Sequence, residues 1–292
     1  MATEIGAGTA TVRWRGLLAE AAARLGSAVD ARRILERASG IEGAELHLGL
    51  DEPVTVRTAA HFEAMVQRRE AGEPLQYVIG SWGFRSIDVF VDRRVLVPRP
   101  ETEAVVEVAL AELRRLGAGR HPTVVDLGTG SGAIALSIAS EVAGADVWAT
   151  DRSADALAVA RANLAGLGRA GTRVRLVEGS WFSALPPILR GRVHLIVSNP
   201  PYVGESEVPD LPPEVARWEP RSALVGGPTG LEQVEAVIEG APPWLSRPGS
   251  LVVEIAPHQA SAAVSRALGA GFSEAGVQPD LAGRLRALVA RI

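Results

Sequence analysis

The C-terminal part of the chain alternates short apolar runs with longer segments whose hydrophobic residues recur at helical spacing. The runs are rich in valine, leucine and isoleucine, as buried parallel strands are. We expect strands at residues 123–127, 145–150, 174–177, 193–198, 250–255, 272–277 and 286–290. Helical patterns fill most of the gaps, at residues 132–142, 153–166, 229–240 and 258–269. This alternation predicts an α/β fold in which a mostly parallel, seven-stranded sheet is covered by helices on both faces.

The first part of the chain has a helical pattern instead. Apolar residues recur there at helical spacing, at Leu17, Leu18, Ala21, Leu25, Phe62, Met65 and Val66. Asp30 is placed to cap a helix over residues 31–35. We therefore expect residues 1–80 to form a small all-helical domain that is better suited to docking a partner than to chemistry.

Between these two patterns lies a stretch with the signature of a hairpin. Residues 80–91 alternate in polarity, with Arg85 and Ser86 near the expected turn. Pro100 is well placed to begin a helix that continues to Leu116. We expect a β-hairpin linker at residues 81–97 and one further domain at residues 98–292.

Composition narrows the classes of function. The chain has 292 residues and a net charge of −4, which argues against binding nucleic acid through a broad basic face. It has no cysteine, so disulfides and thiolate metal sites are excluded, and its five histidines show no metal-ligand spacing. No leader pattern and no apolar stretch of about 18 residues is evident. We expect a cytoplasmic protein without a membrane segment.

The clearest chemical motif is Asn199-Pro200-Pro201-Tyr202, directly after the apolar run at 193–198. Open α/β sheets bind ligands just beyond the C-terminal ends of their strands. Neither proline has an N–H, and Pro201 favours an extended backbone at Pro200, so the nearby carbonyls are left to accept bonds from a ligand. The simpler interpretation is a proline-rich turn with a capping asparagine.

These four residues suit the capture of a planar NH₂ group. The side-chain oxygen of Asn199 and a main-chain carbonyl form two acceptors for its two hydrogens, and the ring of Tyr202 can lie against its flat face. An amide nitrogen is a poor nucleophile, and holding both hydrogens stabilises the positive charge that develops on it during attack. We predict that Asn199, Pro200 and Tyr202 are catalytic and that all four residues, Pro201 included, bind substrate.

A glycine-rich turn marks the expected cofactor site. It follows the strand at 123–127, and the predicted binding residues are Asp126, Gly128, Thr129, Gly130, Ser131 and Gly132. The glycines do not follow the GxGxxG spacing of dinucleotide-binding folds. A carboxylate at position 126 would repel a pyrophosphate but suits an ammonium group.

Two more positions extend this site. Asp151 ends the second strand, where an acid can accept both hydroxyls of a ribose, although it could simply cap the next helix. Trp181 and Phe182 follow the third strand and can wall an adenine, or belong to the core. A ligand with a ribose and an ammonium but no phosphate is S-adenosylmethionine, and Asn199 is expected to border it. Residues 203–230 are rich in proline and glycine and are predicted to form a lid on the substrate side.

Together these residues resemble the peptide chain release factor glutamine-N5 methyltransferases, the PrmC/HemK family. The resemblance covers nearly the whole chain, from Asp30 to Arg284. It is carried by the motifs at 30–36, 72–77, 97–103, 126–132, 151, 181–182, 198–202, 218–220, 226–227, 230–231 and 281–284. Ser180 stands where many relatives have aspartate, and Ala256 where many have glycine.

The resemblance implies a class I, Rossmann-like methyltransferase fold behind a helical substrate-docking domain. It also implies methyl transfer from S-adenosylmethionine to the glutamine of the Gly-Gly-Gln motif of release factors. Separately, we expect a monomer with no stable nucleic acid. Two other functions fit the motifs: N6-adenine methylation of DNA or RNA, because a base amine fits the same four residues, and non-catalytic binding of release factors.

Overall fold

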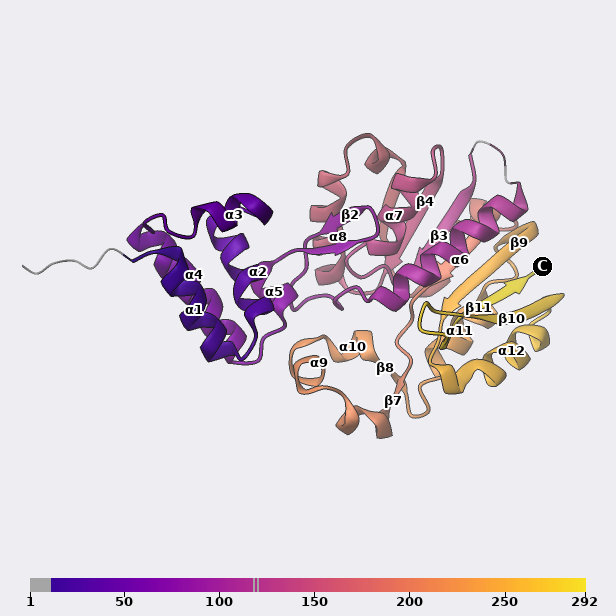
Figure 1. Ribbon diagram of the computed structural model, residues 1–292. Helices are drawn as coiled ribbons and strands as arrows, with labels where there is room; N and C mark the ends of the chain where they lie inside the picture. The colour runs from indigo at the N-terminus through magenta and orange to yellow at the C-terminus, as the bar shows by residue number, and fades with distance from the viewer. Residues whose placement is uncertain (1–11, 118, 120) are drawn as a thin grey trace, which may run out of the picture. The chain divides into compact units, whose positions relative to one another are not determined.

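The computed structural model describes residues 12–117, 119 and 121–292, which fall into two compact units separated between Gly80 and Ser81. The first unit is helical, and the second contains the sheet (Figure 1). The helices of the first unit are α1 (Trp14–Leu25), α2 (Ala28–Ser39), α3 (Gly43–Gly49), α4 (Val56–Glu70) and α5 (Leu75–Ile79). None of the helices among the described residues is both long enough and apolar enough to cross a membrane.

The helical unit has its own core. Ile34 of α2 and Phe62 of α4 are buried, and the ring of Trp14 meets Phe62 edge-on at 6.2 Å between centroids. One local prediction is wrong: Asp30 does not cap α2. Ser27 is the cap, and its hydroxyl accepts a hydrogen bond from the Asp30 N–H at 3.1 Å. Asp30 lies in the first turn, where its carboxylate pairs with Arg69 of α4 at 2.7 Å.

The second unit is built on the seven-stranded sheet that the sequence predicts. Its strand order is β10-β11-β9-β6-β3-β4-β5, parallel except for the antiparallel pairs of β11 with β9 and with β10. The strands are β3 (Thr123–Leu127), β4 (Asp146–Asp151), β5 (Val174–Glu178), β6 (Val193–Ser198), β9 (Leu245–Glu254), β10 (Glu274–Pro279) and β11 (Leu285–Arg291). This is the architecture expected of a class I methyltransferase.

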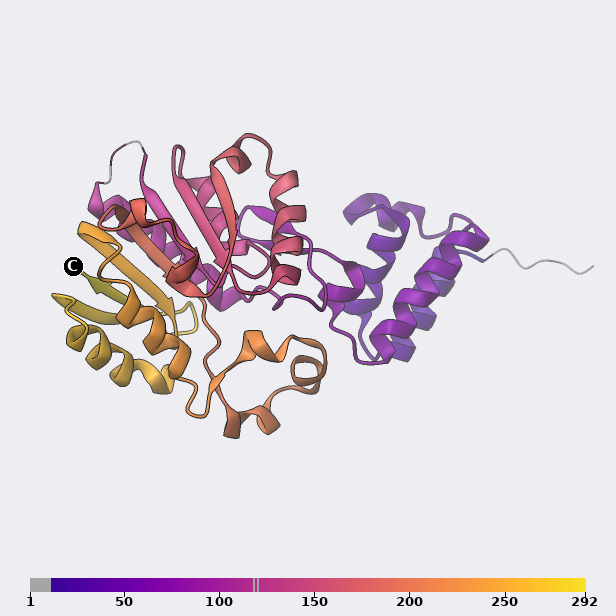
Figure 2. The ribbon, with the colours of Figure 1, turned by 180° about the vertical axis from the view of Figure 1, so that it is seen from behind.

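Helices cover both faces of the sheet, as Figures 1 and 2 show from opposite sides. They are α6 (Pro100–Leu116), α7 (Ala133–Glu141), α8 (Ala154–Gly166), α11 (Glu232–Gly240) and α12 (Ala260–Gly269). Alternate strand residues such as Val125, Leu251 and Val253 share one buried core with α11 and α12. The intervening positions face α6 and α7. On β9 these include Ser250 and Glu254, which hydrogen-bond to residues of α6.

The predicted hairpin is present and belongs to the same compact unit as the sheet. Strands β1 (Trp82–Phe84) and β2 (Ile87–Val89) pair antiparallel. Arg85 in the turn is held by Glu107 of α6 at 2.9 Å and by Glu141 of α7 at 2.6 Å. The hairpin is therefore fastened to two helices of the methyltransferase fold.

Residues 203–230 are less irregular than we predicted. They contain β7 (Val203–Gly204), α9 (Pro213–Trp218), α10 (Arg221–Leu224) and β8 (Val225–Gly227), with 3₁₀ turns at Glu205–Asp210. Further 3₁₀ turns lie at Gly168–Arg173, Trp181–Ala184, Pro187–Leu189 and Pro257–Gln259. Strands β7 and β8 pair in parallel, so the two ends of this segment are tied together. The many prolines begin short helices here instead of preventing them.

A buried carboxylate joins α6 to strands β9 and β11 of the sheet. Glu112 accepts hydrogen bonds from Ser250 at 2.7 Å, Arg115 at 2.9 Å and Arg291 at 2.7 Å. Glu112→Gln keeps the shape but leaves two arginines without their anion. Because both are partly exposed, we expect a loss of about 2 kcal/mol in the free energy of unfolding, measured by urea titration. Glu274→Gln, which removes an exposed partner of Arg291, is the control and should change stability little.

The loss of stability caused by Glu112→Gln should depend on pH, because the pKa of Glu112 is shifted in the folded protein. Burial alone would raise the pKa of Glu112, but the hydrogen bonds outweigh burial and lower it from 4.5 to about 2. A lowered pKa contributes stability that is complete above 4.5 and is lost as the pH falls toward 2. The stability difference between wild type and Glu112→Gln should therefore shrink below pH 4.5. A constant difference down to pH 3 would contradict this assignment.

Candidate active site

The glycine-rich turn and the four-residue motif leave the sheet side by side. Strands β3 and β6 are parallel neighbours, with Leu127 opposite Ser198, and the Ser198 hydroxyl donates to the Leu127 carbonyl at 2.7 Å. Chain connections run outward in opposite directions from this pair of strands. Such a switch point is where open α/β sheets form their ligand crevice. Gly128 and Asn199 are the first residues beyond the two strand ends.

The turn after β3 is organised by a buried carboxylate. Asp126 is 0% exposed, and its Oδ2 accepts hydrogen bonds from the Thr129 hydroxyl at 2.6 Å and the Ala135 N–H at 3.2 Å. Burial raises the pKa of Asp126 to about 7. The carboxylate thus holds the turn against the start of α7. Its contact with an ammonium group stays a prediction.

Asp151 connects the glycine-rich turn to the start of α8. One of its oxygens accepts the Gly130 N–H and the other the Ser153 N–H, both at 2.9 Å. Ser153, rather than Asp151, is the side-chain cap of α8, because its hydroxyl accepts the Ala156 N–H at 3.1 Å. The half-buried Asp151 carboxylate lines a cavity and keeps further lone pairs for a ligand.

Five of the predicted residues border this first cavity. They are Gly128, Asp151, Trp181, Asn199 and Pro201. A Cβ atom at position 128 would lie 3.3 Å from the Trp181 ring, and Gly128 has a φ of 73°, so any other residue here would strain the backbone and crowd the tryptophan. The indole N–H of Trp181 donates to Gln233 at 3.2 Å, which fixes the plane of the ring.

The other predicted cofactor residues lie outside the cavity. Thr129 and Ser131 are buried within the turn, and Gly132 packs against Leu136 of α7. Phe182 turns the other way, where its ring stacks on Trp244 with centroids 6.0 Å apart. Phe182 therefore does not border this cavity, whereas Trp181 does, and the contact of either ring with an adenine stays a prediction.

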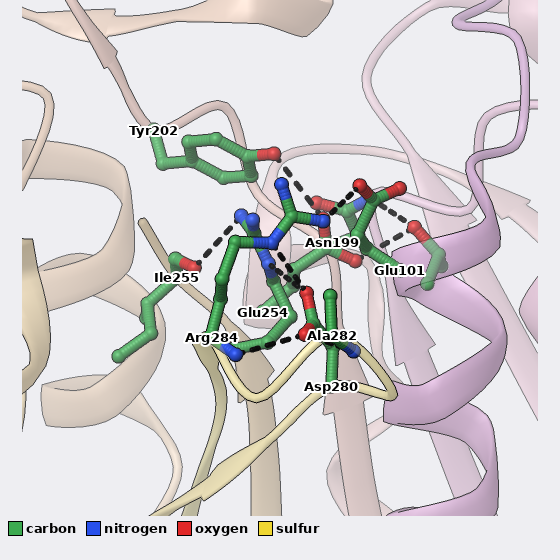
Figure 3. A network of polar contacts seen from close by, with 10 residues as sticks. Glu101, Asn199, Tyr202, Glu254, Ile255, Asp280, Ala282 and Arg284 are labelled. Carbon is green, nitrogen blue, oxygen red and sulfur yellow. Dashed lines mark hydrogen bonds and ion pairs between the residues drawn. The ribbon is translucent and has the colours of Figure 1, made fainter. Parts of the chain in front are cut away.

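The polar groups of the four-residue motif converge on one buried acid (Figure 3). Asn199 Nδ2 donates to the Thr102 hydroxyl at 3.2 Å, and that hydroxyl donates to Glu254 Oε2 at 2.7 Å. The Tyr202 hydroxyl donates to Glu254 Oε1 at 3.2 Å. Pro200 is buried between the two polar residues. One carboxylate therefore holds both polar side chains of the motif.

Glu254 is only 1% exposed, so its charge depends on its neighbours. Burial raises its pKa, while hydrogen bonds from Thr102 and Tyr202 and the charge of Arg286 act in the opposite direction. Arg286 is itself buried and donates to the Ile255 carbonyl at 3.3 Å. Figure 3 shows Asp280 and Arg284, from the turn between β10 and β11, beside this network.

A second cavity lies on the other side of Asn199. Asn199, Tyr202 and Arg99 border it, and its apolar wall includes Leu96, Leu211, Pro212, Val215 and Leu224. Arg99 pairs with the buried carboxylate of Glu219, which joins two motifs that are far apart in the sequence. Asn199 is shared by the two cavities, so a group bound in one can approach a group bound in the other at this residue.

Sequence reasoning missed several residues that hold this site together. Thr102 and Glu254 support the motif, Gln233 orients Trp181, and Gln259 donates to the Tyr202 carbonyl at 2.9 Å. Only Glu254 carried a usable signal, because a glutamate directly after the apolar run at 251–253 is expected to be buried and paired.

Comparisons with known proteins agree with this geometry. Residues 16–80 match the family model described as the PrmC N-terminal domain, and residues 107–211 match the methyltransferase small domain. A release factor glutamine methyltransferase of Cereibacter sphaeroides is 43% identical over 269 residues, 91% of each chain. The chain belongs to the release factor glutamine methyltransferase family. A relative of the same name from Burkholderia pseudomallei is 40% identical over 91% of this chain and 92% of its own.

Solved structures agree with the family's fold. The hMettl16 catalytic domain, solved with MAT2A 3′UTR hairpin 1, has a TM-score of 0.53 at 14% identity over 94% of this chain and 90% of that one. A methyltransferase from Pyrococcus furiosus has a TM-score of 0.50 at 18% identity over 78% of this chain and 96% of that one. At such identities the likeness shows the fold alone. The class I fold and the family imply S-adenosylmethionine as methyl donor.

Proposed function

We propose that this protein transfers a methyl group from S-adenosylmethionine to the side-chain amide nitrogen, N5, of the glutamine in the Gly-Gly-Gln motif of peptide chain release factors. The observation that carries the proposal is the position of Asn199, which borders both cavities. The first cavity receives the donor and the second receives the glutamine side chain. The names of the relatives support the choice of substrate.

The residues of the first cavity fit the donor. The Asp151 carboxylate can accept the ribose hydroxyls, Trp181 offers a flat apolar face to the adenine, and Gly128 lets the donor approach the backbone closely. The donor supplies an electrophilic methyl group on a sulfonium sulfur.

The chain's own contribution to the reaction is to bind and orient the amide. Asn199 Oδ1 and the Pro200 carbonyl accept the two N–H bonds, and Tyr202 packs beside the amide plane. Positioning of this kind can lower a barrier by roughly 7–11 kcal/mol when the attack geometry is met. Tyr202 is no base, because burial and the nearby Glu254 charge raise the pKa of its hydroxyl. The proton on the acidic methylated amide can leave to solvent.

The deciding experiment incubates the protein with S-adenosylmethionine carrying a labelled methyl group and a release factor. We expect label in the wild-type factor and none in a factor whose Gly-Gly-Gln glutamine is changed to alanine. A parallel reaction with adenine-containing DNA and RNA tests the other exocyclic amine that this site would fit. Label in nucleic acid, or no label in any of them in a single turnover, would contradict the proposal.

Asp151→Ala should weaken cofactor binding more than turnover. It removes the acceptor for the ribose and the link between the Gly130 and Ser153 N–H groups. Loss of charge-assisted hydrogen bonds of about 1.5–3 kcal/mol predicts a Kd for S-adenosylmethionine about 10–100-fold higher by calorimetry. Asp155→Ala, an exposed change in the first turn of the same helix, is the matched control and should bind normally. Unchanged affinity of Asp151→Ala would exclude the ribose contact.

We further propose that the helical unit, residues up to 80, docks the release factor, and that residues 81–97 link it to a catalytic domain at 98–292. The match of residues 16–80 to the PrmC N-terminal domain supports a conserved role for this unit. Deleting it should raise the KM for the release factor and leave the Kd for S-adenosylmethionine unchanged. A monomeric state, the absence of stable nucleic acid and a cytoplasmic location stay predictions from the sequence.

A further inference from the structure

The carboxamide of Asn199 has two ends of nearly the same shape, and only one of them can accept a hydrogen bond. If the oxygen faces the acceptor nitrogen, Asn199 captures an N–H; if the NH₂ end faces it, two donors meet and repel each other. The function proposed above, on which this inference rests, therefore needs a device that fixes the orientation of the amide.

The device lies behind Asn199, in the chain of hydrogen bonds that runs into the sheet. Glu254 Oε2 accepts the single hydrogen of the Thr102 hydroxyl, at 2.7 Å. The Thr102 oxygen is then left with lone pairs alone. It faces Asn199 at 3.2 Å and can bind only the NH₂ end of the amide. The acceptor at Glu254 thereby fixes the direction of the hydrogen bond at Thr102, and this bond in turn fixes which end of the Asn199 amide faces Thr102.

We propose that Thr102 and Glu254 are positioning residues that hold the Asn199 carboxamide with its oxygen directed at the substrate nitrogen. Neither side chain borders the two cavities, so both act through Asn199 and not on the ligands.

The arrangement around Glu254 supports this role. Its second oxygen accepts the Tyr202 hydroxyl at 3.2 Å. One carboxylate oxygen therefore binds the motif directly, and the other binds Thr102, which contacts Asn199. Arg286 of β11 provides the positive charge that favours the anion, and Glu101 of α6 is the acidic group that opposes it. Figure 3 shows Glu101 and Tyr202 near Glu254, which lies at the C-terminal end of β9.

The test compares two substitutions at one position. Thr102→Val keeps the shape and removes the hydroxyl, whereas Thr102→Ser keeps the hydroxyl. We expect Thr102→Val to lower kcat about tenfold, the effect of one misdirected hydrogen bond, with KM for the release factor and Kd for S-adenosylmethionine close to wild type. Thr102→Ser should retain most of the wild-type kcat. Thr172→Val, an exposed change whose hydroxyl only bonds the Arg169 carbonyl, is the control for the substitution itself.

A double-mutant cycle separates positioning from a structural role. In an Asn199→Ala background, Thr102→Val should cause no further loss of kcat, because there is no amide left to orient. Glu254→Gln should lower kcat at least as much as Thr102→Val, since its NH₂ group can donate to Thr102 and reverse the hydrogen-bond chain.

The outcomes that overturn the inference are distinct from failure of the proposed function. If wild type methylates the release factor and Thr102→Val matches its kcat, the inference is wrong. It is equally wrong if Thr102→Ser is as impaired as Thr102→Val, or if Thr102→Val costs the same with and without Asn199. If wild type itself transfers no methyl group to the factor, the proposed function fails first.

Discussion

Replacing Asn199 by alanine is expected to lower kcat by about 10²–10³-fold, the usual effect of deleting one group that stabilises developing charge in a preorganised site. The loss arises because the amide hydrogen that Asn199 Oδ1 should accept is left without its partner as positive charge grows on the nitrogen. Affinity for S-adenosylmethionine should stay near wild type, because Asp151 and Trp181 remain in place at the first cavity. Single-turnover transfer of labelled methyl measures the first quantity, and calorimetry the second.

Asp151→Ala provides the reciprocal control for this experiment. It should raise the Kd for the donor, and most of its turnover should return when the donor is saturating, which would not happen with Asn199→Ala. Wild-type turnover in Asn199→Ala would remove this residue from the mechanism. If affinity for S-adenosylmethionine fell as well, Asn199 would instead contribute more to binding the donor in the first cavity than to binding the substrate in the second.

The sequence was sufficient for the central strands of the sheet, because a strand that is buried on both faces forms a continuous apolar run. The predicted strand at 193–198 matches β6 residue for residue. The strand expected at 250–255 begins earlier in the structure, at Leu245. Leu245 pairs with Val193 of β6 and Ser250 pairs with Leu195, so the chain bulges between them, around Pro248 and Gly249, which resemble a turn in the sequence. Periodicity detects buried side chains, but it does not detect an irregular strand.

The structure places some of the predicted site residues at the first cavity and others away from it, a difference that the sequence pattern could not show. Trp181 and Phe182 are adjacent in the sequence, and the sequence contains nothing that distinguishes them. Trp181 has a φ of 46° and faces the first cavity, while Phe182 fills the space beside Gly240, where a Cβ atom would lie 2.4 Å from its ring. Which of the two rings borders the first cavity depends on a helix some 50 residues further on, so local pattern could not decide it.

Support for the motif was out of reach of sequence reasoning because it is long-range. Thr102 and Glu254 are 152 residues apart and meet only because α6 packs on the face of β9 that carries every second residue. The motif at 97–103 predicted a helix start, and the run at 250–255 predicted a strand. Neither pattern indicates the contact between Thr102 and Glu254, because this contact depends on the order of the strands and on which face of the sheet α6 covers.

Gly226→Ala is expected to lower turnover strongly, although Gly226 lies outside the motif itself. A Cβ atom at Gly226 would lie 2.5 Å from the Pro201 carbonyl oxygen and 2.7 Å from the Gly230 carbonyl oxygen, both of them backbone atoms that cannot rotate away. Strand β8 would have to move off the residues that follow Tyr202. Because a displacement of about 1 Å in a positioned site can cost about 10²-fold, we expect kcat to fall by about that factor.

The expected effect of Gly226→Ala depends on the close approach of β8 to the motif. The control must therefore be a strand glycine whose Cβ position has no close neighbour. Gly276 in β10 has open space around its Cβ position and an ordinary φ, and Gly276→Ala should keep wild-type turnover. Overpacking usually costs about 1–3 kcal/mol, which Gly226→Ala should show in urea unfolding without loss of donor affinity. If Gly226→Ala turned over like wild type, the pairing of β7 with β8 would not be what holds Pro201 and Tyr202 in place. The rigidity of the motif would then come from its prolines and from Glu254 alone.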